Sequence, residues 1–268
     1  MIDRGAGNVL GVRVDAVDYE SALSRILDSA LSGRRCTASA LAVHGVVTGA
    51  LDGEHRHRLN HLDLVVPDGQ PVRWALNLLH GFRLPETVCG PVLTDLLCAE
   101  AARRAVPVYF YGSTSGTLEK LQANLLRRFP GLVIAGSEPS RFRRLSEQER
   151  QEAAVRIRAS GARILFVGLG CPRQEVFAYE MGRILPMPIL AVGAAFDYHA
   201  GLLKQTPPLL QRIGLMWLHR LIQEPRRLWR RYLVTNTQFV VLFLAQWLRL
   251  WSPRLERTTL PSADLRFG

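Results

Sequence analysis

Three loops of this 268-residue chain place glycine beside polar or charged side chains, each directly after an apolar run typical of a buried strand. The first covers residues 65–70, where the apolar run ends in Pro67, Asp68 and Gly69. A carboxylate held at the tip of a strand can act as a general base. Asp68 could also cap a helix that begins near Gln70. The spacing leaves these two interpretations open.

The second loop, residues 111–116, joins a strand to a helix through small residues that include Gly112 and Ser113. Backbone N–H groups at the start of a helix can hold a phosphate, helped by the helix dipole. The loop is not a Walker motif, because no Gly-Lys-Ser/Thr follows, and it lacks the full G-x-G-x-x-G spacing. A phosphate site and a structural turn both fit this sequence.

The third loop, residues 166–175, leads from an apolar strand through Gly168 and Gly170 into a helix. Arg173 can pair with a phosphate. Gln174 offers both a donor and an acceptor, which suits the edge of a nucleobase. Helix capping is the structural alternative for this polar group.

Strand-like and helix-like segments alternate through the first two thirds of the chain, which predicts an α/β fold. Strands are expected at residues 11–14, 37–43, 62–66, 106–111, 132–135, 163–167 and 189–192. Helices are expected at residues 19–31, 46–60, 70–79, 92–104, 118–129, 147–160 and 174–183. Ligands bind beyond the carboxyl ends of parallel strands, so we expect the three loops to lie close together.

After residue 201 the strand signals stop, and helical segments rich in Leu, Trp and Arg follow. We therefore predict an α/β catalytic domain at residues 1–201 and a helical appendage at residues 202–268. Three acidic residues in the appendage stand against eleven basic ones: Lys204, Arg212, Arg220, Arg226, Arg227, Arg230, Arg231, Arg249, Arg254, Arg257 and Arg266. This charge favours phosphate, nucleic acid or an anionic membrane as a partner, although a solvated face has the same composition.

Residues 239–251 are apolar, with tryptophan at positions 247 and 251 and Arg249 between them. A helix lying in a membrane interface fits this pattern, and a core or oligomer-contact helix is the alternative. No run reaches the ~20 apolar residues that a transmembrane helix needs. Residues 1–8 lack the apolar stretch of a secretory signal.

No metal motif is evident from the spacing of ligand residues. Histidines 55, 57 and 61 share a polar segment, which we interpret as a solvated helix face because no matching carboxylates accompany them. No D-x-D motif is present, so we expect neither a metal nor another cofactor. The cysteines form no C-x-x-C pair, and we expect them to be reduced, as in a cytosolic protein: Cys36, Cys89, Cys98 and Cys171.

Four blocks together resemble the WecG/TagA/CpsF family of glycosyltransferases. Residues 62–69, L-D-L-V-V-P-D-G, are similar to the family's signature ending in P-D-G. Residues 168–175, G-L-G-C-P-R-Q-E, resemble its G-x-G-x-P-K-Q-E. Two further blocks, V-G-A-A-F-D-Y-H-A-G at 192–201 and Q-E-P-R-R-L-W-R-R-Y at 223–232, are also similar to family motifs. The blocks follow the family's order, and the resemblance covers roughly residues 12–234.

The resemblance implies an inverting glycosyltransferase that moves a sugar from a UDP-sugar to an undecaprenyl-diphosphate-linked saccharide. Typical donors carry N-acetylmannosamine, its uronic acid or glucuronic acid, and the products are exopolysaccharides or cell-wall polymers. The implied fold is a Rossmann-like parallel sheet flanked by helices. Its helical C-terminal appendage would dock on the inner, cytoplasmic face of the bacterial plasma membrane. The resemblance does not fix the oligomeric state, and a homo-oligomer is compatible with it.

The resemblance also assigns roles to single residues. Asp68 is the implied catalytic base, and Arg227 and Arg231 are expected near the diphosphate. Arg220 joins them on one face if the helix is continuous, which Pro225 could interrupt. Arginines and helix N-termini can replace a metal ion in stabilising a departing UDP. The other candidates are expected to bind the UDP-sugar: Gly112, Ser113, Gly168, Gly170, Arg173, Gln174, Glu175 and Asp197.

One departure from the family concerns a Thr-x-Asn that many members carry upstream, because this chain has Ala40 and Ala42 there. Ser39 is adjacent, but one step along a strand reverses the face of a side chain. The alternative function is therefore a non-catalytic UDP-sugar-binding or scaffold protein of a polysaccharide assembly complex. A nucleic-acid binder fits the charge alone, and no recognised motif supports it, so we predict no nucleic-acid partner. The missing glycine fingerprint disfavours an oxidoreductase.

Overall fold

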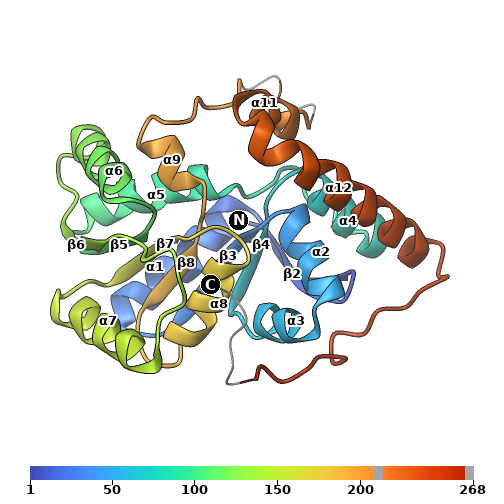
Figure 1. Ribbon diagram of the computed structural model, residues 1–268, viewed down its shortest axis with the longest axis horizontal. Helices are drawn as coiled ribbons and strands as arrows, with labels where there is room; N and C mark the ends of the chain where they lie inside the picture. Colours follow the sequence, from blue (N-terminus) through green and yellow to red (C-terminus); the bar gives the residue numbers. More distant parts are fainter. Residues whose placement is uncertain (208–209, 211–213, 263–268) are drawn as a thin grey trace.

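The computed structural model describes residues 1–207, 210 and 214–262, and it is built on a six-stranded parallel sheet (Figure 1). The strand order is β4-β3-β8-β7-β5-β6. The strands are β3 (Cys36–Leu41), β4 (Leu64–Pro67), β5 (Val108–Gly112), β6 (Ile134–Glu138), β7 (Ile164–Gly168) and β8 (Pro188–Ala191). This confirms the predicted α/β class with a parallel sheet. Arg212, Asp264 and Arg266 lie outside the described residues.

Helices flank both faces of this sheet. They are α1 (Tyr19–Ser32), α2 (Val43–Leu51), α3 (Gly53–Asn60), α4 (Gln70–His80), α5 (Gly90–Arg103), α6 (Ser115–Arg128), α7 (Glu147–Ala159), α8 (Arg173–Met181), α9 (Ala195–His199), α11 (Met216–Gln223) and α12 (Pro225–Trp247). The expected helices are present with small shifts of their ends, apart from the one expected at residues 46–60.

That segment forms two helices, α2 and α3, instead of one. The Asp52 side chain accepts hydrogen bonds from the N–H groups of Glu54, at 2.9 Å, and His55, at 3.0 Å. Asp52 is therefore the N-cap of α3, and it starts a second helix directly after the first one ends. The prediction of a continuous helix was wrong because this local capping bond outweighs the helical periodicity around it.

An antiparallel hairpin of β1 (Asp3–Val9) and β2 (Val12–Val17) precedes the sheet. The prediction found only part of β2, because the first residues of β1 are polar or glycine and largely exposed. Buried Asp15 anchors the hairpin to the sheet, since its Oδ2 accepts the N–H of Val65 in β4 at 2.7 Å. The strand that leads to Asp68 is thereby held from its outer side.

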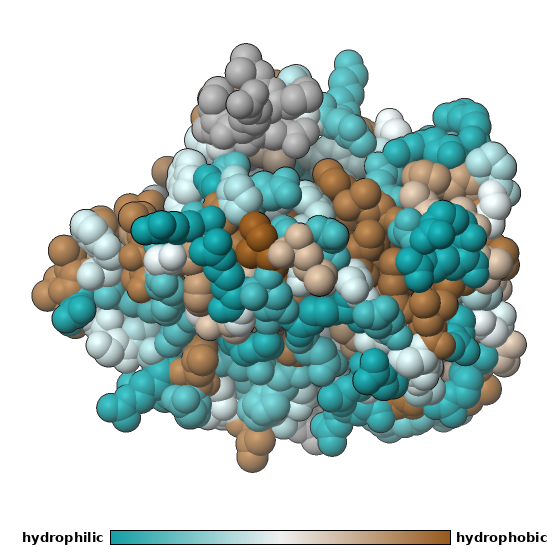
Figure 2. Space-filling model, turned by 180° about the vertical axis from the view of Figure 1, so that it is seen from behind, coloured by the Kyte–Doolittle hydropathy of each residue, from teal (hydrophilic) through white to brown (hydrophobic). Residues whose placement is uncertain are grey.

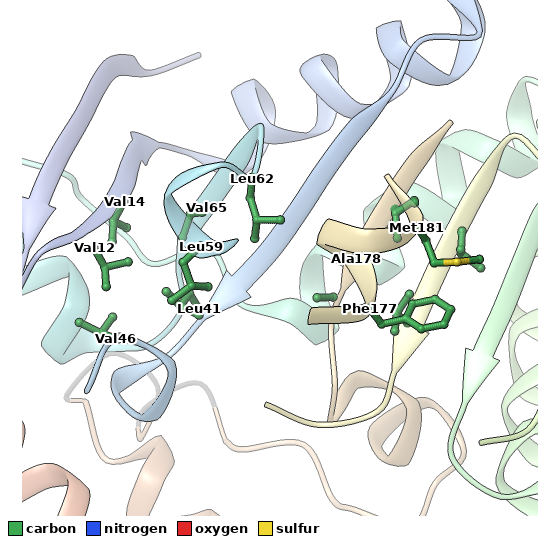
Figure 3. Close-up of a cluster of buried hydrophobic side chains, with 14 of the residues drawn as sticks. Val12, Val14, Leu41, Val46, Leu59, Leu62, Val65, Phe177, Ala178 and Met181 are labelled. Carbon is green, nitrogen blue, oxygen red and sulfur yellow. The ribbon is translucent and has the colours of Figure 1, made fainter. Parts of the chain in front are cut away.

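Apolar layers on both faces of the sheet fix the positions of the strand ends. Figure 3 shows one layer, with side chains from β2, β3, β4, α2, α3, α8 and the turn between α3 and β4: Val12, Val14, Leu41, Val46, Leu59, Leu62, Val65, Phe177, Ala178 and Met181. On the other face Phe110 of β5 stacks on Phe166 of β7, with ring centroids 5.3 Å apart. Phe196 of α9 meets Phe110 edge-on. The loops after these strands therefore start from a rigid base.

The C-terminal helices pack on the α/β part. α12 lies along α2 and α4 (Figure 1), and Phe239 of α12 is buried in the same core layer as the β2 valines. Gln246 bonds to the hairpin twice, accepting from Leu10 N at 2.8 Å and donating to Asn8 O at 2.9 Å. The division of the chain at residues 201 and 202 stays a prediction.

The outward side of α12 carries exposed apolar side chains at helical spacing. We call this set the α12 outer face: Trp229, Leu233, Leu244 and Trp247. Exposed Arg226 and Arg230 lie on the same helix. Figure 2, drawn from behind, shows apolar side chains at the side of the molecule that α12 occupies in Figure 1. Among the described helices, none is at once long and apolar enough to cross a membrane.

The start of α2 lacks a side-chain cap. Its N-cap is Ala42, exposed and in an extended conformation that suits a capping residue, but its methyl group accepts no hydrogen bond. Ala42→Asn is expected to stabilise the protein by about 1 kcal/mol, because the new amide oxygen would satisfy a free N–H group. This corresponds to a Tm rise of about 2–4 °C in a thermal melt.

Ala42→Leu is the control for this stabilisation, since leucine matches asparagine in size and cannot accept a hydrogen bond. An equal Tm rise in both variants would show that filled space, and not capping, causes the effect.

Candidate active site

A cavity of about 1190 Å³ lies at the carboxyl edge of the sheet, under α11 and α12. Its walls come from the loops after β3, β4, β5, β7 and β8, as expected for parallel strands that end at one edge. It is lined by all but one of the candidate residues: Asp68, Ser113, Gly168, Gly170, Arg173, Gln174, Glu175, Asp197, Arg220, Arg227 and Arg231. Gly112 is absent from this lining.

Asp68 lies directly after β4, where its N–H donates to Leu41 O at 3.2 Å. Its side chain is partly buried at the cavity wall and does not cap α4, whose N-cap is Gly69 without a side-chain bond. The capping interpretation was therefore wrong. Asp68 Oδ2 instead accepts the N–H of Gly90, the first residue of α5, over a long 3.4 Å. The carboxylate thus faces a helix N-terminus, which favours its charged form.

Burial raises the pKa of Asp68 above its ordinary value, against the lowering effects of the Cys89 side chain, the Gly90 N–H and the charge of Arg220. A carboxylate with a raised pKa binds a proton more tightly than an exposed one. Asp68 therefore has the raised basicity that suits a general base.

Arg220 of α11 and Arg227 and Arg231 of α12 approach the cavity. They lie on two helices and not on one, because Pro225 begins α12 and separates it from α11. Glu224 lies at this break, 2.9 Å from Arg227 Nη1 and 3.6 Å from Arg220 Nε. The Nε atoms of Arg220 and Arg231 are both buried with no hydrogen-bond partner among the described residues, and Arg231 differs in having no carboxylate of those residues within ion-pair distance. Burial lowers the pKa of Arg231. A buried cation of this kind is stabilised by an anionic ligand.

A buried polar network lies under the third loop. Gln174 Nε2 donates to Glu175 Oε1 at 2.8 Å, and Ser39 Oγ donates to the same oxygen at 3.1 Å. One of the two N–H donors of Gln174 is therefore used inside the protein, and its contact with a nucleobase stays a prediction. Its Oε1 is buried without a partner in the described part of the chain. Ser39, set aside because of its register, supports this network from β3.

The comparison with protein families gives a clear match. The model of the "Glycosyl transferase WecG/TagA/CpsF family" matches residues 7–253. The chain belongs to this family. It is also similar to an N-acetylglucosaminyldiphosphoundecaprenol N-acetyl-beta-D-mannosaminyltransferase of Bacillus spizizenii, with 31% identity over 176 residues. That match covers 65% of this chain and 66% of the relative, so the chain spans slightly less than two thirds of the relative's length.

The second loop has a structural role, in agreement with the structural turn that its sequence also allowed. A side chain at Gly112 would bring its Cβ to 2.6 Å from Gly168 O, so Gly112 permits β5 and β7 to approach. The N–H of Ser113 donates to Gly168 O at 3.0 Å. That N–H is not free to bind a phosphate, which corrects part of the prediction for this loop.

Two further polar residues of this family member line the cavity. Burial raises the pKa of Asp197 in α9, and the charge of Arg227 lowers it. Burial and the charge of Arg231 lower the pKa of His44 to about 4, so its imidazole is neutral at pH 7. His44 was not predicted to line the cavity, because a single histidine near a strand end carries no signal of its surroundings.

The interpretation of the histidines as a solvated helix face was wrong for two of the three. His55 is 0% exposed and His57 is buried, while only His61 is exposed. The rings of His57 and His61 stack with their centroids 3.9 Å apart. Neither ring nitrogen of His55 has a hydrogen-bond partner among the described residues. The charged neighbours in sequence hid this burial, since α3 packs against α8 and α2.

Proposed function

We propose that this protein is an inverting glycosyltransferase that moves a sugar from a UDP-sugar to an undecaprenyl-diphosphate-linked saccharide. The donor sugar would be N-acetylmannosamine, its uronic acid or glucuronic acid, and the product would enter exopolysaccharide or cell-wall polymer synthesis. One observation supports this best: Asp68 and the charges of Arg220 and Arg231 line the same cavity at the sheet edge. The name of the Bacillus relative, which acts on a lipid-diphosphate saccharide, agrees with the proposed acceptor.

In the proposed reaction, Asp68 accepts the proton of an acceptor hydroxyl while its oxygen attacks the anomeric carbon of the donor sugar. The bond between this carbon and the UDP oxygen breaks on the opposite side, which inverts the configuration. The arginines at 220, 227 and 231 stabilise the negative charge that develops on the departing diphosphate. Proton transfer to Asp68 and the build-up of negative charge on the diphosphate therefore occur on opposite sides of the sugar ring.

The donor nucleotide is proposed to lie along the loop that follows β7. Gly168 and Gly170 let the backbone approach it, and exposed Arg173 can pair with its phosphates. Gln174 can accept a hydrogen bond through its unpartnered Oε1. Glu175 is almost completely buried and accepts a hydrogen bond from Gln174. Its main role in donor binding would be to hold the Gln174 side chain in position.

The transfer reaction is tested with purified protein. UDP-sugars are first screened for thermal stabilisation, and each ligand is then offered with a short-chain lipid-diphosphate sugar while UDP release is measured. Glycosyl transfer predicts both stabilisation and UDP release that requires the acceptor. Stabilisation without UDP release would favour the non-catalytic binding or scaffold protein. The absence of polar side chains at Ala40 and Ala42 is the observation that supports this alternative.

The α12 outer face is proposed to dock on the inner face of the plasma membrane. Exposed tryptophans and aliphatic side chains beside Arg226 and Arg230 match the pattern of helices that lie in a lipid interface. Each arginine near an anionic surface would contribute about 1 kcal/mol. An acceptor carried on a lipid would then reach the cavity below α12.

Changing the docking face should release the protein from lipid. Trp229→Glu combined with Leu233→Glu is expected to weaken binding to vesicles containing phosphatidylglycerol by about tenfold or more, because two apolar contacts are lost and two repelling charges are gained. Co-sedimentation with vesicles measures this. Val155→Glu on α7, at another exposed apolar residue, is the control and should bind as the unchanged protein does. Equal binding by the double variant would contradict docking through this face.

A further inference from the structure

We infer that His55, Cys171 and Glu175 form a site for a divalent transition-metal ion of the zinc class in the wall of the cavity. One ligand atom from each side chain, an imidazole nitrogen, the thiol sulfur and a carboxylate oxygen, lies within 4.8 Å of the other two. The three residues come from α3, the loop after β7 and α8. This inference goes beyond glycosyl transfer and does not depend on it.

The groups around this point have unused hydrogen-bonding capacity. His55 is fully buried, and both of its ring nitrogens lack a partner among the described residues. Oε2 of Glu175 is also buried without a partner in the described part of the chain. Burying such groups unsatisfied is costly, and native structures rarely do so. A single ion shared by the three side chains would satisfy the imidazole and the carboxylate together.

The ligand set agrees with zinc chemistry. Zinc accepts imidazole nitrogen, thiolate sulfur and carboxylate oxygen together, whereas calcium and magnesium prefer oxygen alone. Bonds of about 2.0–2.3 Å in a tetrahedral zinc site place the ligand atoms roughly 3.3–3.6 Å apart. The present separations are within 4.8 Å, so ion binding would draw the three side chains together by up to about 1.5 Å through changes in their torsion angles.

Charge also permits a dication here. A thiolate and a carboxylate together would neutralise the ion, and neutral imidazole is the form of histidine that binds metals. Metal binding would replace the thiol proton, which leaves to solvent. No oxidation or reduction is involved.

The position of the site gives the ion a structural consequence. Cys171 and Glu175 line the cavity, whereas His55 lies behind them in α3. An ion bound by all three would tie α3 to the loop that carries Arg173 and to the helix that carries Gln174. Three protein ligands leave a fourth position for water or a ligand oxygen. No motif in the sequence predicts this site, since the three ligands are far apart in the chain and follow no regular spacing.

Cobalt and zinc binding test the inference on the full chain without any sugar donor. The protein is treated with a chelator, dialysed, and titrated with Co²⁺, whose thiolate complexes absorb in the near ultraviolet, and then with Zn²⁺ in competition. We expect one ion per chain, a thiolate band, and displacement by zinc. Cys171→Ser should abolish the band and weaken zinc binding by more than the 10–100-fold that loss of an outer-shell contact costs. His55→Gln should weaken binding similarly.

Cys98→Ser is the matched control, because Cys98 is a fully buried thiol in α5 on the other face of the sheet, and this variant should bind as the unchanged protein does. Circular dichroism checks that each variant folds, and Cys171→Ser, the smallest change, decides the result if His55→Gln does not. Absence of a thiolate band, or an unchanged band in Cys171→Ser, would overturn the inference in favour of a buried bridging water. Because no sugar donor is present, such a failure leaves glycosyl transfer untouched.

Discussion

Replacing Asp68 by asparagine is expected to lower the rate of sugar transfer by about 10²–10⁴-fold, the usual contribution of a general base. The amide has nearly the same shape as the carboxylate but cannot accept the acceptor proton. Binding of the UDP-sugar should change little, because the reacting hydroxyl belongs to the acceptor. Asp28→Asn, an exposed aspartate of α1, is the control and should retain full activity. Unchanged UDP release by Asp68→Asn would exclude this residue as the base.

The activity should also depend on pH in a direction set by Asp68. Only the ionised carboxylate can act as the base, so the rate should rise with pH as Asp68 loses its proton and fall below its pKa. Because burial raises this pKa, the acidic limb of the profile should lie above the ordinary aspartate value of 3.8. The dependence of kcat/KM on pH reports the pKa in the free enzyme. A limb at or below 3.8 would contradict the environment described for Asp68.

Replacing Arg231 by alanine is expected to lower kcat by about 10²–10³-fold, the range found when one preorganised donor to a developing anion is removed. Arg231 has a buried Nε without a hydrogen-bond partner and, unlike Arg220 and Arg227, no carboxylate within ion-pair distance in the described part of the chain, so its charge is available to the diphosphate. Alanine is a strong helix former, which keeps α12 intact. UDP affinity and kcat are measured together, and both should decrease.

Arg230 supplies the matched control for this prediction. It is the preceding residue of α12, it is exposed, and it does not line the cavity. Arg230→Ala should leave kcat with a soluble short-chain acceptor unchanged. Arg231→Lys should fall between the two, because lysine keeps the charge and loses the planar pair of donors. Equal losses in Arg230→Ala and Arg231→Ala would indicate that the general charge of α12, and not a specific contact, matters.

The sequence by itself determined the alternation of strands and helices and the loops that line the cavity. Strands buried on both faces, such as β7, are continuous apolar runs, and this signal is local. The Pro-Asp-Gly turn after β4 is equally local, since Gly69 has a positive φ of 87° that favours glycine. The basic composition after residue 201 also needs no structure to be recognised. Local signals failed where polar residues form an element, as in β1.

Tertiary structure alone decided which of these polar groups are free and which are used. The N–H of Ser113 donates to Gly168 of β7, and one N–H of the Gln174 amide donates to Glu175. Neither hydrogen bond follows a sequence motif such as that of a helix cap. Burial of His55 and of Arg231 arises from helices packing across long chain separations. Desolvation and hydrogen bonding depend on the groups that surround an atom in space, and the order of residues along the chain fixes these only through the fold.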